Sequence, residues 1–262
     1  GEQQVIVNTI QMDQRISIFQ NKGQIILRLP FHYSYGNLAQ TYGIGDVSLG
    51  LNYLFPTNKK YQFSGFLGGK LPVNDANIEE DGKGLPMVYQ TSLGTYDFLA
   101  GVNLMFKKWQ FGLGYQQPFG ENNNTFTHSA WEGNEDAIQY YESAYLKRAA
   151  DVVGRADKLF NFKNNSLKAG LVAIYRVEPD RITIDGVTSY PEDSKGLTLN
   201  ASVVYEISMA NNDKIQLSLA APLITREYRT DGLTRTFVLG FGYVFGQKKD
   251  KVLEPVNIGS GD

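Results

Sequence analysis

Cysteine is absent from the 262 residues, and histidine occurs only twice, at His32 and His128. Without cysteine the chain cannot form disulfides, thiolate nucleophiles or cysteine-ligated metal centres. An excess of one charge is lacking too, because 25 basic residues are matched by 27 acidic ones and leave a net charge of -2. Such a balance gives no long-range field that would gather a polyanion. We therefore predict no nucleic-acid partner, no cofactor and no metal.

Long apolar runs are also missing. No stretch approaches the roughly 18 to 20 apolar residues that a membrane-spanning helix needs, and the first residues, GEQQVIVN, lack the basic and apolar regions of a signal peptide. The chain is thus expected to be mature, truncated or never exported. A membrane-spanning β-strand needs only about ten alternating residues, and its polar lumen side lowers the average. The mean hydropathy of -0.29 is therefore compatible with a membrane barrel.

What the sequence has in abundance is alternation with a period of two. In residues 24–35, Ile25 and Leu27 lie on one face, while Gln24 and Arg28 lie on the other. This is the pattern of a strand whose two faces meet different surroundings. The pattern predicts ten clear strands, at residues 5–19, 24–35, 43–55, 60–73, 95–107, 108–119, 165–178, 196–209, 213–226 and 233–245.

The segment 145–162 is ambiguous, because the surrounding sequence contains good helix formers. Its even positions Leu146, Val152 and Phe160 are apolar and alternate with polar odd positions, although Arg148 and Lys158 break the series. We interpret the segment as an eleventh strand rather than a surface helix.

The connections between these strands alternate in length. Short connections rich in turn residues lie near 21–23, 56–59, 107–108, 163–165 and 211–213, and longer loops lie at 36–42, 74–94, 120–144, 179–195 and 227–232. Tight turns at one end and extended loops at the other are typical of outer-membrane barrels. We therefore predict an all-β fold, an antiparallel transmembrane β-barrel of about twelve strands. Residues 1–245 would form this single domain, followed by a polar C-terminal tail at 246–262.

Eleven visible strands are an odd number, whereas single-chain barrels of bacterial outer membranes have even numbers. We expect a first strand that precedes the visible ones to be missing, because an unpaired edge would expose backbone groups to lipid. The alternative is a barrel of ten strands, with residues 5–19 outside the membrane.

Several segments resemble a known group of barrels. They are YGIGDVSLGLNYLF (42–55), GGKLPV (68–73), SLGTYDFLAGVNLMFKKWQFGLGYQQPF (92–119) and the closing TFVLGFGYVF (236–245). Over most of its length the chain is similar to outer-membrane transporters of the meta-pathway phenol-degradation type, especially their Bacteroidota relatives. The resemblance implies passage of small molecules, hydrophobic or aromatic ones among them, and assigns no site residue. The chain departs from the family by continuing for 17 residues beyond Phe245 and by beginning where the family's second strand begins.

The alternation also predicts which charged side chains face the lumen. Acidic and basic groups are nearly balanced there, so we expect pairing across strands rather than a strong ion filter. The candidate lumen-facing residues at a constriction are Arg28, Asp46, Lys70, Asp97, Asp151, Arg155 and Arg176. Tyrosine and phenylalanine near the strand ends of the other face suit aromatic girdles at lipid headgroups.

The sequence contains little evidence for a catalytic site. Neither His32 nor His128 lies in a diagnostic motif, and the acidic stretch 74–82 lacks the ligand spacing of a calcium loop. We predict that the protein is no enzyme, with no catalytic residues. The predicted function is a channel or facilitator for passive passage of a small solute through the bacterial outer membrane. The alternative is a plugged structural barrel that binds envelope protein partners. The expected partners are the lipid bilayer, the solute and such envelope proteins.

Overall fold

The computed structural model describes residues 5–56, 60–210, 212–232 and 236–245. Its long strands are β1 (Ile6–Ile18), β2 (Gly23–Tyr35), β4 (Val47–Leu54), β5 (Tyr61–Leu71), β8 (Tyr96–Phe106), β9 (Trp109–Phe119), β10 (Asp151–Asn161), β11 (Asn165–Arg176), β14 (Gly196–Ser208), β15 (Lys214–Ile224) and β16 (Val238–Val244). The short elements are β3 (Gln40–Ile44), β6 (Glu79–Glu80), β7 (Lys83–Gly84), β12 (Ile182–Ile184), β13 (Val187–Ser189) and the 3-10 turns η1 (Met87–Tyr89), η2 (Ser129–Trp131), η3 (Ala137–Gln139) and η4 (Glu192–Ser194).

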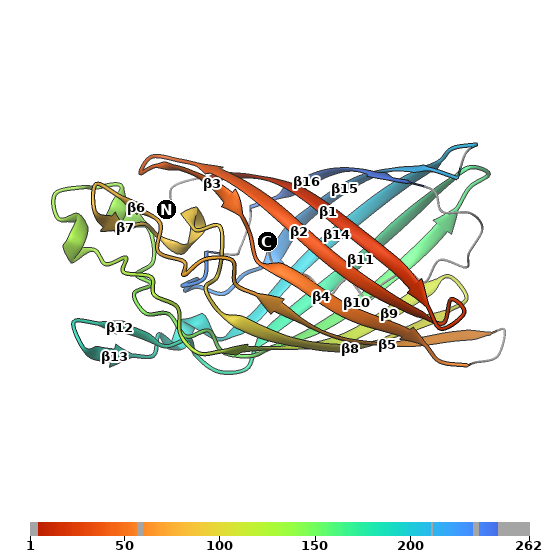
Figure 1. Ribbon diagram of the computed structural model, residues 1–262, viewed down its shortest axis with the longest axis horizontal. Coiled ribbons are helices and arrows are strands. Elements are labelled where there is room, and N and C mark those ends of the chain that lie inside the picture. The colour runs from red at the N-terminus through yellow and green to blue at the C-terminus, as the bar shows by residue number, and fades with distance from the viewer. Residues whose placement is uncertain (1–4, 57–59, 211, 233–235, 246–262) are drawn as a thin grey trace.

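The long strands form one antiparallel sheet in which neighbours in sequence are neighbours in space. The short strand β3 pairs with β2 and is the twelfth strand of this sheet. The strands tilt about a common axis as a barrel (Figure 1). The predicted antiparallel β-barrel of about twelve strands is therefore confirmed.

The two ends of the barrel differ. Short connections join β1 to β2, β4 to β5, β8 to β9, β10 to β11 and β14 to β15 at one end, which we call the turn end. The long connections, with β6, β7, β12 and β13, gather at the opposite end, which we call the loop end (Figure 1, left). The alternation of short and long connections in the sequence thus predicted the polarity of the barrel.

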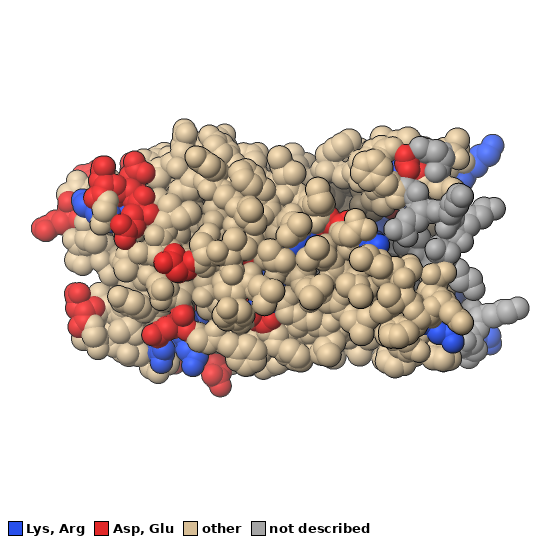
Figure 2. All heavy atoms as spheres, in the orientation of Figure 1, with Lys and Arg blue, Asp and Glu red and all other residues tan. Residues whose placement is uncertain are grey.

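The wall is apolar outside and polar inside, the reverse of a soluble β-sandwich. Outward side chains such as Ile10, Leu113 and Phe241 are 76%, 56% and 73% exposed. Inward amides and hydroxyls such as Ser64 and Asn103 are buried. A strand shift of one residue would exchange these two sets, so the contrast fixes the register. In Figure 2 most of the surface over the middle of the molecule is uncharged, and charged residues are more frequent toward the two ends.

One loop prediction and two strand predictions need correction. The predicted loop at 36–42 contains the start of β3, and the predicted strand 43–55 is interrupted between β3 and β4, where Gly45 donates a backbone hydrogen bond to Pro30. The eleventh strand exists, but it begins at Asp151 rather than at 145. Leu146, expected on the outer face, is fully buried among the loops instead. Its backbone NH binds the side chain of Asn122, so this segment pairs with a loop and not with the wall.

The sheet has two ends, β1 and β16. Because each neighbouring pair along the row of eleven long strands is antiparallel, β1 and β16 run in the same direction. Between the described residues of β1 and β16 no ladder forms. A strand filling this seam would run antiparallel to both, so the further strand expected from the sequence stays a prediction. The tail at 246–262 lies outside the described residues, and the division into a barrel at 1–245 and this tail also stays a prediction.

Within the part of the chain that the structure describes, no helix is both long and apolar enough to cross a membrane.

Candidate functional site: the charged lumen beneath the loop cap

The connections at the loop end pack into a compact unit. We call the segments 72–95, 120–150, 177–195 and 225–232 the loop cap. Its apolar core contains Leu85, Tyr89, Phe126, Trp131 and Tyr140, all of which are buried. The indole NH of Trp131 donates to the Gly84 carbonyl over 2.9 Å, and the hydroxyls of Tyr89 and Tyr140 lie 3.1 Å apart. Long loops that would otherwise be mobile are thus held by a core of their own.

Two buried asparagines join separate segments of the cap. Asn124 Nδ2 donates to the carbonyls of Ala76 and Leu85 over 3.0 and 2.9 Å, while its Oδ1 accepts from Phe126 N and Ser143 Oγ. Asn122 acts in the same way between the carbonyl of Leu93 and the NH of Leu146. An amide that both donates and accepts satisfies irregular backbone without secondary structure. The two side chains therefore replace strand pairing inside the cap.

Below this core, a buried ion pair attaches the cap to the wall. Arg148, just before β10, places Nη2 2.7 Å from Oδ2 of Asp97 on β8. The same nitrogen lies 2.9 Å from Thr95 Oγ1, and Gln116 Nε2 also donates to Asp97. Burial alone would lower the pKa of Arg148, but the Asp97 carboxylate outweighs it and raises this pKa above its usual value. Arg148 therefore carries its charge inside the barrel.

A second cluster surrounds Arg176, at the loop end of β11. Its Nε and Nη2 bind both carboxylate oxygens of Asp151 over 3.0 and 2.9 Å, so the contact is bidentate. Nη1 lies 2.7 Å from Asp180 and 2.9 Å from Asp231, both of which belong to the cap. Arg226 also contacts Asp231 over 3.3 Å. One guanidinium thus joins the wall to two different loops.

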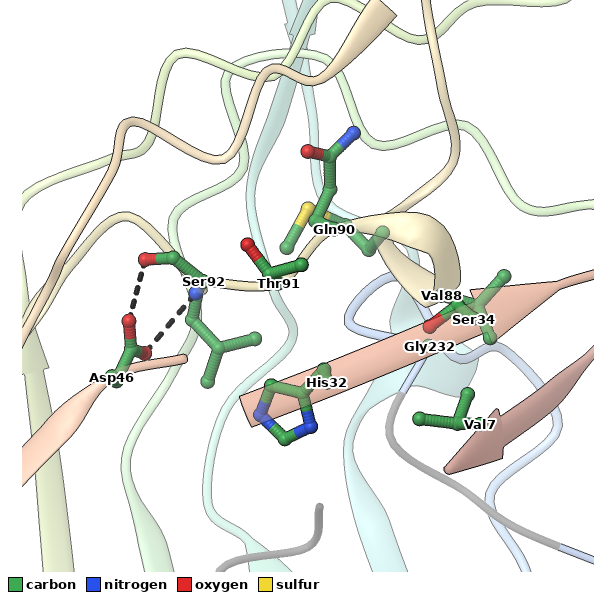
Figure 3. A pocket seen from close by; sticks show the side chains of 11 residues that line it. Val7, His32, Ser34, Asp46, Val88, Gln90, Thr91, Ser92 and Gly232 are labelled. Carbon is green, nitrogen blue, oxygen red and sulfur yellow. Dashed lines mark hydrogen bonds between the residues drawn. The ribbon is translucent and has the colours of Figure 1, made fainter. Parts of the chain in front are cut away.

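The third contact between cap and wall involves Asp46, at the break between β3 and β4. Ser92 Oγ and the NH of Leu93 donate to its two carboxylate oxygens over 2.5 and 3.1 Å (Figure 3). Lys70 is buried, lies opposite Asp97 in the ladder, and interacts electrostatically with Asp46 as well. A cavity of about 30 Å³ lies beside Asp46, with His32, Ser34 and Thr91 in its lining (Figure 3). It has the size for one ordered water rather than for a solute.

Two predicted lumen residues lie apart from these contacts. Arg28 on β2 binds Asp13 across the β1–β2 ladder over 3.1 Å, and both side chains are partly exposed. Arg155 binds Asp157 two residues along β10 over 2.5 Å. Gly170 stands beside Asp157, and a Cβ there would lie 2.2 Å from the Asp157 carboxylate. Glycine at this position leaves room for the charge.

The lumen-facing candidates from the sequence can be compared with the contacts that their side chains make in the structure. Sequence reasoning expected charge pairing across strands without naming the pairs, and the structure places Arg176 opposite Asp151 and Lys70 opposite Asp97 in the ladders. Sequence reasoning missed the loop residues Arg148, Asp180, Arg226 and Asp231 as members of the site. One signal was available for Arg148, which together with Lys158 interrupts the apolar series of even positions. Asp180, Arg226 and Asp231 lie in irregular loops, where no periodicity exists to mark them.

The histidines are engaged in the fold. His128 places Nε2 2.8 Å from the Tyr140 carbonyl, which can only accept, so this nitrogen donates and is not free to act as a base toward a hydroxyl. His32 Nδ1 lies 2.9 Å from Thr9 Oγ1 inside the barrel. Among the described residues, no group of three or more acidic, histidine or cysteine side chains is arranged to hold a metal ion.

The barrel fold is similar to that of a solved outer membrane channel. The chain is similar to the COG4313 outer membrane channel from Pseudomonas putida F1, whose crystal structure superposes with a TM-score of 0.64. The match has 15% sequence identity and covers 91% of this chain and 82% of that channel. No family model and no curated protein matches the sequence. This similarity supports a channel-like fold. It does not support the more specific assignment to the meta-pathway phenol-degradation type or to its Bacteroidota relatives.

Proposed function

We propose that this protein is a channel of a bacterial outer membrane that admits a small solute, and that the loop cap closes it in the described conformation. The observation that carries the proposal is the inverted wall, whose outward side chains are apolar while its lumen is lined by amides, hydroxyls and paired charges. Such a surface suits a bilayer outside and water within. The similarity to an outer membrane channel supports the same conclusion.

The gate in this proposal is the loop cap as a whole. Its interior is apolar, whereas its main contacts with the wall are polar: Arg148 with Asp97, Asp180 with Arg176, and Ser92 with Asp46. Polar contacts can be exchanged for contacts with water at modest net cost, whereas an apolar core cannot. Displacement of the intact cap is therefore the easier route to an open lumen.

The solute belongs to the proposal as well. The resemblance to meta-pathway phenol-degradation transporters makes small aromatic and other hydrophobic molecules the first solutes to assay. We propose that the protein has no catalytic activity, and the description of the similar structure as an outer membrane channel supports this proposal.

A second candidate is a permanently plugged barrel that binds envelope proteins through its loops. It is favoured by the extent of the cap core and by the buried ion clusters beneath it. The two candidates differ in one property: a gated channel conducts when the contacts between cap and wall are weakened, and a plugged scaffold does not.

Single-channel conductance in planar bilayers distinguishes them. We would compare the wild type with Arg148→Met, which removes the charge that binds Asp97, and with Lys147→Met, which removes an exposed charge one residue away. Heat-modifiable electrophoretic mobility would confirm that each barrel is folded. The channel proposal expects a severalfold rise in mean conductance for Arg148→Met alone. Silence from a folded Arg148→Met barrel would instead favour the plugged scaffold.

A further inference from the structure

Charge is distributed unequally between the two ends of the barrel. Carboxylates dominate the loop end, whereas lysines mark the turn end (Figure 2). Four of the five short turns carry at least one lysine in the sequence: Lys22, Lys60, Lys107 with Lys108, and Lys163. In the described residues of these turns the one carboxylate is that of Asp213, which accepts a hydrogen bond from Tyr243. The turn end is therefore a cationic rim.

Aromatic side chains lie directly beside this rim on the outer face. Tyr61 and Phe106 stack with ring centroids 4.9 Å apart, and Trp109 stacks on Phe111 at 6.0 Å. Lys107 Nζ lies 5.1 Å from the Phe106 ring centroid. Tyr61 and Trp109 carry a polar group on an apolar ring, and such rings favour the boundary between acyl chains and headgroups. We call these four rings the aromatic belt, and it places the neighbouring ammonium groups at headgroup level.

Lys158 gives a closer limit on the depth of the headgroup region, because its side chain points outward from the barrel wall toward the lipid. It lies opposite Trp109 in the β9–β10 ladder, and its Nζ is 4.9 Å from the Trp109 ring and 5.8 Å from the Phe160 ring. A lysine on the lipid face is costly at the bilayer centre and nearly neutral at the interface. Lys158 lies three residues before the end of β10, which is about 10 Å along the strand. The headgroup region must therefore extend to this depth.

We infer that the turn end binds the phosphates of anionic phospholipids, with Lys107, Lys108 and Lys158 around Trp109 forming the contact. Ammonium groups attract anionic headgroups, and the adjacent rings hold them at the depth of the phosphate plane. The inference rests on the proposal that the barrel spans a membrane, and it is independent of whether the lumen conducts. The proposed ligand of the rim is a lipid headgroup rather than a protein or a free anion.

Tryptophan fluorescence provides the test, since the chain has only two tryptophans. Trp109 lies in the aromatic belt, whereas Trp131 is buried in the cap. The protein, as wild type and as Trp131→Phe, would be placed in vesicles that contain brominated phosphatidylglycerol or brominated phosphatidylcholine. Quenching of Trp109 gives the relative association constant of the two lipids. We expect a roughly two- to fivefold preference for phosphatidylglycerol at low salt, weakened by added NaCl.

The combined variant Lys107→Gln, Lys108→Gln, Lys158→Gln should reduce the ratio to about one. The matched control is Lys83→Gln, because Lys83 also lies over a tryptophan, with Nζ 5.4 Å from the Trp131 ring, but at the loop end. Lys83→Gln should keep the preference. Equal quenching by both lipids, or a preference that survives the triple substitution, would overturn the inference while leaving the membrane barrel intact. Absence of quenching by either lipid would overturn both.

Discussion

Replacing Arg176 by methionine provides the most direct test of how cap and wall are joined. The substitution keeps an unbranched side chain of similar length and removes the guanidinium. Three carboxylates, those of Asp151, Asp180 and Asp231, then lose a contact of 2.7 to 2.9 Å. Asp231 keeps Arg226 at 3.3 Å, and Asp180 keeps the NH of Ala149 at 2.9 Å. Asp151 loses both of its bidentate contacts.

The size of the expected loss in the free energy of unfolding follows from the burial of these side chains. Arg176 is 2% exposed, and the carboxylates of Asp180 and Asp231 are 0% exposed. Removing one partner of a buried ion pair costs about 3 to 5 kcal/mol, because the remaining charge is left without compensation. Three carboxylates depend on this guanidinium, and two of them keep other partners. We therefore expect a loss in the free energy of unfolding of about 4 kcal/mol.

The assay is reversible urea unfolding in lipid vesicles, followed by tryptophan fluorescence and electrophoretic mobility. Arg28→Met serves as the control, because Arg28 also points inward and pairs with one aspartate, Asp13, but both side chains are partly exposed. A pair of this kind contributes at most about 1 kcal/mol. If both substitutions cost the same, buried charge does not hold the cap to the wall, and the reasoning fails.

Two further predictions concern the wall and the cap. Leu113→Lys, on the outer face of β9, should destabilise the barrel by about 2 to 4 kcal/mol in vesicles. Phe119→Lys, at the end of the same strand, should cost at most about 1 kcal/mol. Equal losses for the two variants in urea unfolding would contradict a bilayer around β9. The pKa of Tyr140 is raised by burial and by its hydrogen bond with Tyr89. Above about pH 10 the unfolded chain releases this proton and the folded cap does not, so the stability of the cap should fall as the pH rises. Proteolysis of the cap between pH 9 and 11 measures this, and Tyr140→Phe should weaken the pH dependence; an unchanged dependence would exclude Tyr140 as its cause.

The wall of the barrel could be predicted from the sequence because its two faces meet different solvents. Each strand then repeats the same contrast every second residue, as Ile25 and Leu27 do against Gln24 and Arg28. The placement of Asp97, Asp151 and Arg176 in the lumen follows from this parity alone. Their exact partners do not, since parity gives a face and leaves the contacts within that face open.

The cap could not be predicted, because its order comes from contacts between distant segments without a period. Asn124 has no sequence signal that distinguishes it from the neighbouring Asn123, yet it alone holds four groups of two loops. The error at Leu146 has the same origin. Its parity continues that of β10, but the tertiary contact with Asn122 removes the segment from the wall. The local sequence pattern does not predict the structure where a side chain, rather than a neighbouring strand, makes the hydrogen bonds to the backbone.

The arrangement of apolar and charged groups at the loop end also indicates how the proposed gate would move. If the cap opened by unfolding, Leu85, Phe126 and Tyr89 would each enter water, at about 1.5 to 3 kcal/mol per side chain. Displacement of the folded cap leaves this core intact and hydrates Arg148, Asp97 and Arg176 instead. Hydration compensates much of the lost pairing for a charge, and compensates none of the lost burial for an apolar ring. The ion clusters are therefore the part of the proposed closed state that water can replace, while the apolar core of the cap would stay intact as the cap moves.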